Sequence, residues 1–103
     1  MRKGKSVQPV AMPDLRLPFT PLQLAKAITS KRTTLNLRQA DVADTLGMSK
    51  STLVKIEKGD IGVNLNNVLK VMEYLGLSFQ IRTDEPSSLS PFHVHPEVDD
   101  DWT

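Results

Sequence analysis

Two short amphipathic segments separated by a three-residue break constrain the fold of this 103-residue chain more than any other feature. They lie in the stretch LRQADVADTLGMSKSTLVKIEKGD, residues 37–60, on either side of Gly47-Met48-Ser49. The pattern predicts a helix over about 38–46, a tight turn that Gly47 permits, and a second helix over about 50–58 that Ser49 caps. The side chains expected to point inward are Val42, Ala43, Leu46, Leu53 and Ile56.

Two further helices frame this pair. One begins near Thr20, a suitable N-cap, with Pro21 at the first helical position, where proline is tolerated. The other covers about 65–75, with Asn64 as its cap and Gly76 as its stop. The expected inward faces are Leu24, Ala25 and Ile28 in the first, and Leu65, Val68, Leu69, Met72 and Leu75 in the second.

The segment LSFQIRT alternates apolar and polar residues, which predicts one β-strand after the last helix. A lone strand leaves its backbone groups unpaired, so it must pair with the N-terminal arm, with another protein or with its symmetry mate. We expect the symmetry mate, because two copies also shield Phe79 and Ile81. A core of this size is marginal alone, which also favours a homodimer. The predicted fold is therefore all-α with one strand paired across a dimer.

Composition divides the chain into an arm over 1–20, a folded domain over 21–82 and a tail over 83–103. The arm and the tail are rich in proline and cannot bury enough apolar surface to offset their ordering entropy, so we expect both to be flexible. The tail holds six acidic residues and no lysine or arginine, which leaves 13 basic and 6 acidic residues in 1–82, a net charge of +7. A basic body favours a polyanionic partner.

Several function classes are disfavoured. The chain has no cysteine for a disulfide scaffold, no apolar run long enough for a membrane span and no apolar signal segment after Arg2, Lys3 and Lys5, so we expect a cytoplasmic protein. His93 and His95 lack the scaffold of a metal site. No phosphate loop or nucleophile motif is present, so we expect no cofactor and no enzymatic activity.

The two helices of residues 37–60 form a helix-turn-helix. With Leu53 and Ile56 inward, positions 51, 55 and 58 lie on the outward face, beside 50 and 54. Lys50 or Lys55 can donate to guanine, and Ser51 or Thr52 can reach a base edge or a phosphate. The alternative interpretation is an ordinary solvated helix face.

The spacing of these residues resembles the XRE/Cro-type helix-turn-helix repressors, which have a lambda-repressor-like fold. The resemblance covers about residues 22–76 and is carried by the segments LRQADVA, LGMS, TL and IEKG within residues 37–59. It implies DNA contacts from Lys50, Ser51, Thr52 and Lys55, and a phosphate contact from Gln39 at the start of the second helix. Arg38 stands where the family often has a Thr, Ser or Asn cap, so this residue reaches a phosphate instead or leaves the helix start less defined.

Arg32 lies on the apolar face of the first helix and needs a partner for its charge. Glu57 lies one turn after Leu53 and faces partly inward. The resemblance implies an ion pair between Arg32 and Glu57, which makes both residues structural.

The order of four helices, the segment SFQIR and an acidic tail that ends in Asp-Trp-Thr resembles the HipB-type antitoxins. This implies a dimeric repressor of its own operon that binds palindromic DNA and a HipA-type serine/threonine kinase toxin, with ATP and Mg²⁺ belonging to the toxin. Trp102 would then anchor the tail on that partner, whereas the alternative is an exposed terminus. A generic XRE-type repressor without a toxin and a protein-interaction module remain alternatives.

Overall fold

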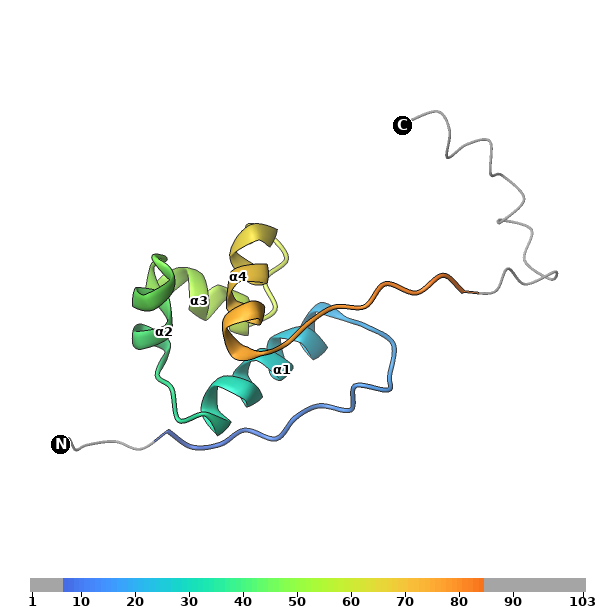
Figure 1. The fold of residues 1–103 in the computed structure, drawn as a ribbon, viewed down its shortest axis with the longest axis horizontal. Helices are drawn as coiled ribbons and strands as arrows, with labels where there is room; N and C mark the ends of the chain where they lie inside the picture. The colour runs from blue at the N-terminus through green and yellow to red at the C-terminus, as the bar shows by residue number, and fades with distance from the viewer. Residues whose placement is uncertain (1–6, 85–103) are drawn as a thin grey trace, which may run out of the picture.

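The computed structural model describes residues 7–84, which form four helices and no strand within that range. They are α1 (Pro21–Thr34), α2 (Gln39–Leu46), α3 (Lys50–Glu57) and α4 (Leu65–Leu75) (Figure 1). The predicted all-α domain is confirmed. No helix in the described part of the chain is long and apolar enough to cross a membrane.

The helix ends follow the capping signals of the sequence. Thr20 Oγ1 accepts the Gln23 N–H at 3.0 Å, and Ser49 Oγ accepts the Thr52 N–H at 3.1 Å. Asn64 caps α4 through the N–H of Asn66, at 2.7 Å. These bonds satisfy N–H groups that have no partner inside a helix, so the starts of α1, α3 and α4 are fixed locally.

The helix α2 starts one residue later than predicted. Arg38 is its N-cap, has an extended backbone and makes no side-chain capping bond. A guanidinium has no acceptor to offer the free N–H groups of the first turn, so this start lacks the side-chain cap seen at the other three helices.

All four helices contribute to one hydrophobic core. The helix α2 packs on α3, and α1 contacts both α3 and α4 (Figure 1). The core cluster comprises Ile28, Val42, Ala43, Leu53, Ile56, Val68, Val71, Met72 and Leu75, and Ala25 and Ala27 are buried as well. Leu24 and Leu46, which we predicted to point inward, are partly buried against this cluster.

The inward face of α4 differs from the prediction at two positions. Leu65 and Leu69 are exposed, and Val71 is buried in their place. At about 100° per residue, Val68, Val71, Met72 and Leu75 form one stripe, and Leu65 and Leu69 lie on its flank. The apolar face of α4 is therefore wider than the face that is buried against the other helices of this chain.

Residues 7–20, the described part of the N-terminal arm, run alongside α1 in the opposite direction (Figure 1). Its backbone bonds to α1 and the following loop near Val7 and Val10, and Gln23 Nε2 donates to the carbonyls of Asp14 and Leu17. The Asp14–Arg16 turn closes on an exposed ion pair, and Arg16 holds the pKa of Asp14 below its usual value by hydrogen bonding. Apart from this turn, residues 7–20 are extended, and the flexibility of the arm stays a prediction.

Residues 77–84 leave α4 after Gly76, which has the left-handed backbone of a helix stop. No backbone ladder joins them to the arm or to any other segment among residues 7–84, so the predicted strand is not formed within the described chain. Phe79 instead packs edge-to-face on Phe19, with ring centroids 5.7 Å apart. The strand and its pairing across a dimer stay predictions, and Trp102 lies outside the described residues.

Candidate nucleic-acid interface

The turn between α2 and α3 is set by backbone geometry. Gly47 has φ of 71°, the left-handed conformation that side chains disfavour, and Met48 N–H donates to the Ala43 carbonyl at 2.9 Å. Ala43 is buried, and its small side chain lets α2 and α3 approach closely. The turn therefore fixes the orientation of α3 relative to α2.

The helix α3 has one buried and one exposed side. Leu53 and Ile56 lie in the core, whereas Lys50, Ser51 and Lys55 are exposed. The exposed residues span the length of a helix whose inner side is held by the rest of the domain. The arrangement presents two ammonium groups and a hydroxyl on a rigid element, which is what contact with a DNA groove requires.

Thr52 is less available than the sequence suggested. It is half-buried, and its Oγ1 lies 2.9 Å from the Ser49 Oγ that caps the helix. One hydroxyl can still both donate and accept, so a DNA contact from Thr52 stays a prediction that has to coexist with this cap.

Arg32 and Glu57 form the ion pair that the sequence led us to expect. Arg32 Nε lies 2.6 Å from Glu57 Oε2, and Arg32 Nη2 lies 2.9 Å from Glu57 Oε1. The side chains are only 10% and 6% exposed. Arg32 Nη1 also donates to the Leu37 carbonyl at 2.7 Å, so the same guanidinium holds the loop before α2. The pair therefore joins α3 to α1 and to that loop.

Two neutral side chains complete the shell around this carboxylate, a role that the sequence did not indicate for either. Thr29 Oγ1 and Gln39 Nε2 each donate to Glu57 Oε1 at 3.1 Å. Thr29 lies three residues before Arg32 on the same face of α1, a spacing that could have indicated it. Gln39 ties the start of α2 to the end of α3, and its expected phosphate contact stays a prediction.

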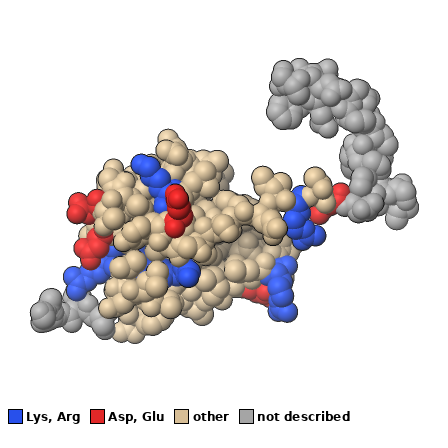
Figure 2. Space-filling view, viewed as in Figure 1, with Lys and Arg blue, Asp and Glu red and all other residues tan. Residues whose placement is uncertain are grey.

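Charge around the interface is mixed. Arg38, Lys50, Lys55 and Lys58 are exposed near α2 and α3, but so is Asp41 on α2. The face seen in Figure 2 likewise carries acidic side chains among basic ones. Basic residues at specific positions, rather than one continuous basic surface, therefore distinguish the outer side of α3.

No group of three or more histidine, cysteine, aspartate or glutamate residues in residues 7–84 is placed to hold a metal ion. His93 and His95, the pair considered from the sequence, lie outside that range.

The fold and this interface define the class of the protein. The family model described as Helix-turn-helix matches residues 28–81, more than half of the chain. The chain belongs to the helix-turn-helix family.

Solved structures share this fold. One chain of a complex of HipA, HipB and O2–O3 aligns over 67% of this chain and 97% of its own length, with a TM-score of 0.60 and 23% identity. A HipB–O4 20mer complex gives the same coverage and identity with a TM-score of 0.59. A HipB variant bound to an O2 20mer aligns over 70% of this chain and 100% of its own length, with a TM-score of 0.61 and 24% identity. At these identities the likeness is one of fold. Among curated proteins, none matched the sequence.

Proposed function

We propose that the chain is a sequence-specific DNA-binding repressor that places the outer side of α3 in the major groove. The observation that carries the proposal is the two-sided environment of α3. Its inner side is held by Leu53, Ile56 and the Glu57 network, and its outer side exposes Lys50, Ser51 and Lys55. Membership of the helix-turn-helix family supports the same function.

Each outer residue has a role in this proposal. Lys50 and Lys55 donate to guanine O6 or N7, and Ser51 and Thr52 contact base edges or phosphates. Arg38 and Gln39, at the start of α2, contact the phosphate backbone and set the register of α3. The Gln39 amide nitrogen carries two hydrogens, so one can donate to a phosphate while the other donates to Glu57.

Removing both lysines tests the assignment. We expect Lys50→Ala/Lys55→Ala to weaken binding to a duplex from the chain's own promoter by about 100-fold or more, because each well-placed base contact is worth roughly 1–3 kcal/mol. The matched control is Lys70→Ala, which removes an exposed lysine from α4. Fluorescence anisotropy measures affinity, and circular dichroism checks that folding is unchanged. Equal affinities of the double variant and the control would contradict the assignment.

We also propose that two copies pair through residues 77–82 as strands around a two-fold axis. The segment has no ladder partner among residues 7–84 and carries Phe79 and Ile81, which are 46% and 94% exposed. Leu65, Leu69 and Phe19 are exposed as well. Large apolar side chains that gather on a surface favour a protein interface.

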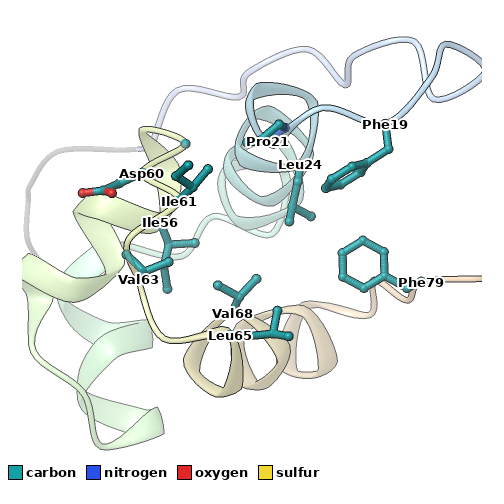
Figure 3. A pocket seen from close by; sticks show the side chains of 11 residues that line it. Phe19, Pro21, Leu24, Ile56, Asp60, Ile61, Val63, Leu65, Val68 and Phe79 are labelled. Atoms are coloured by element: carbon teal, nitrogen blue, oxygen red, sulfur yellow. The ribbon is translucent and has the colours of Figure 1, made fainter. Parts of the chain in front are cut away.

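Part of this apolar surface borders a cavity of about 240 Å³. Phe19 and Phe79 lie on one side of it, and Leu65, Val68 and Ile56 line it from the helices (Figure 3). Its lining is almost wholly apolar, so covering it with a second copy would remove apolar area from water and stabilise the dimer. A dimer with two α3 helices fits palindromic DNA with half-sites about 34 Å apart.

The finer proposal is that this repressor is an antitoxin that binds a HipA-type serine/threonine kinase toxin and represses their common operon. The shared fold with a chain of the HipA–HipB–O2–O3 complex supports it. In this proposal the acidic tail and Trp102 contact the toxin. The antitoxin itself has no enzymatic activity.

Removal of residues 84–103 tests the antitoxin role. Co-expressed with the kinase-like product of a neighbouring reading frame, the full chain should relieve toxicity, whereas the truncated chain should fail to do so. The truncated chain should still bind promoter DNA, because α3 is intact. Full relief by the truncated chain would place toxin contact on the helical body. Absence of a kinase-like neighbour would instead favour a generic repressor, and failure to bind DNA would favour an interaction module.

A further inference from the structure

The apolar cavity beside Phe79 is large enough to hold a side chain and is open at one side. Its volume is about 240 Å³, and an apolar protein cavity of about 150 Å³ can hold a benzene ring, so a branched aliphatic side chain fits. The buried residues Ile56 and Val68 line its inner part, and the exposed residues Leu65 and Phe79 line its outer part (Figure 3). An aliphatic side chain needs no hydrogen-bond partner in such surroundings.

Ile81 is the most exposed large apolar side chain among residues 7–84, at 94%. It stands two residues after Phe79, in a segment that runs away from the helices (Figure 1). Residues two apart share a face of a strand, so in the proposed strand Ile81 and Phe79 point to the same side. The Ile81 side chain therefore projects next to the cavity wall without filling the cavity of its own chain.

A projecting side chain and an open cavity on one patch make that patch self-complementary. Two-fold symmetry brings the same patch of both copies together, so each copy can offer its side chain to the cavity of the other. Opposing side chains of an antiparallel pair share a face, and centring the proposed pair on Phe79 or on Gln80 keeps the apolar residues together. Either register places Ile81 of the second copy opposite or diagonal to Phe79, beside the outer part of the cavity.

We infer that Ile81 of a second copy inserts into this cavity, so that the dimer contains two insertions related by its two-fold axis. The inference rests on the proposed dimer and names the contact that stabilises it. A second copy fits better than a small apolar molecule, because the chain itself carries an unburied aliphatic side chain two residues from the cavity wall. Each insertion removes the isoleucine and the cavity lining from water together.

Mixing two variants tests the insertion. Leu65→Trp places a bulky ring at the mouth of the cavity and keeps the inserting residue, whereas Ile81→Ala keeps the cavity and removes the inserting side chain. Both positions are exposed in the single chain, so folding should be retained, which circular dichroism checks. Neither homodimer can then form an insertion, but the mixed dimer forms one.

Native mass spectrometry measures how the mixed chains pair. We expect each homodimer to be about 100-fold weaker than the wild-type dimer, because each of the two lost insertions is worth about tenfold in affinity. The same factor should raise the mixed dimer to about nine tenths of all dimers, against about one half for random pairing.

Leu35→Trp is the matched control, because Leu35 is 48% exposed and does not line the cavity. Mixed with Ile81→Ala, it should give only the random share of mixed dimer, since its own homodimer keeps both insertions and independent contacts add. A wild-type monomer would contradict the proposed dimer and this inference with it. A wild-type dimer in which Leu65→Trp and Ile81→Ala also pair at random would overturn the insertion and leave the strand pairing standing.

Discussion

Replacing Arg32 by methionine should lower the free energy of unfolding by about 3–5 kcal/mol, the usual cost of stranding one member of a buried ion pair. Glu57 would keep only the neutral donors Thr29 and Gln39, and the Leu37 carbonyl would lose its partner. Domains of this size are stable by only about 5–15 kcal/mol, so the variant should lose a large share of its stability. Urea unfolding followed by circular dichroism measures the change.

The chain contains its own control for this prediction. Arg16 also forms a bidentate pair, with Asp14, but the Arg16 side chain is 91% exposed. Water screens such a pair, so Arg16→Met should leave the urea midpoint nearly unchanged. The double variant Arg32→Met/Glu57→Leu should recover part of the missing stability, because no charge then remains buried. If Arg32→Met proves no more destabilising than Arg16→Met, the Glu57 network is not structural.

Replacing Ile81 by aspartate should convert the proposed dimer to a monomer. The side chain is 94% exposed in the single chain and would lie in the strand interface of the dimer. A charge buried there without a partner opposes association. Light scattering should give the mass of two chains for the wild type and the mass of one chain for the variant. Promoter affinity should fall about 100-fold or more, because two linked sites bind far more tightly than one.

The neighbouring residue provides the matched control. Gln80 lies on the opposite side of the alternating pattern, so Gln80→Asp makes a similar change away from the proposed apolar interface. This variant should remain dimeric and bind DNA normally. A wild-type monomer, or a stable dimer of Ile81→Asp, would exclude pairing through residues 77–82.

Local signals made much of this fold predictable. Thr20, Ser49 and Asn64 are short polar residues at helix starts, and Gly47 and Gly76 supply left-handed stops, so the helix limits depend on a few neighbouring residues. The orientation of α3 follows from the spacing of Leu53 and Ile56. These features need no knowledge of distant parts of the chain.

The features that the sequence did not predict depend on distant contacts. The exposure of Leu65 and Leu69 is decided by which neighbours reach that flank of α4, and periodicity carries no such information. The bond from Gln39 to Glu57 spans 18 positions between two helices. The path of the arm along α1 was not predicted either, because its proline-rich sequence has no hydrophobic periodicity that identifies a packing partner.

Lysine footprinting on promoter DNA tests the central claim most directly. The exposed amines are acetylated with and without the duplex, and mass spectrometry reads each site. Lys50 and Lys55 should lose most of their reactivity when DNA binds, whereas Lys70 on α4 should keep its own. Full reactivity of Lys50 and Lys55 in a chain saturated with promoter DNA would contradict a reading role for α3.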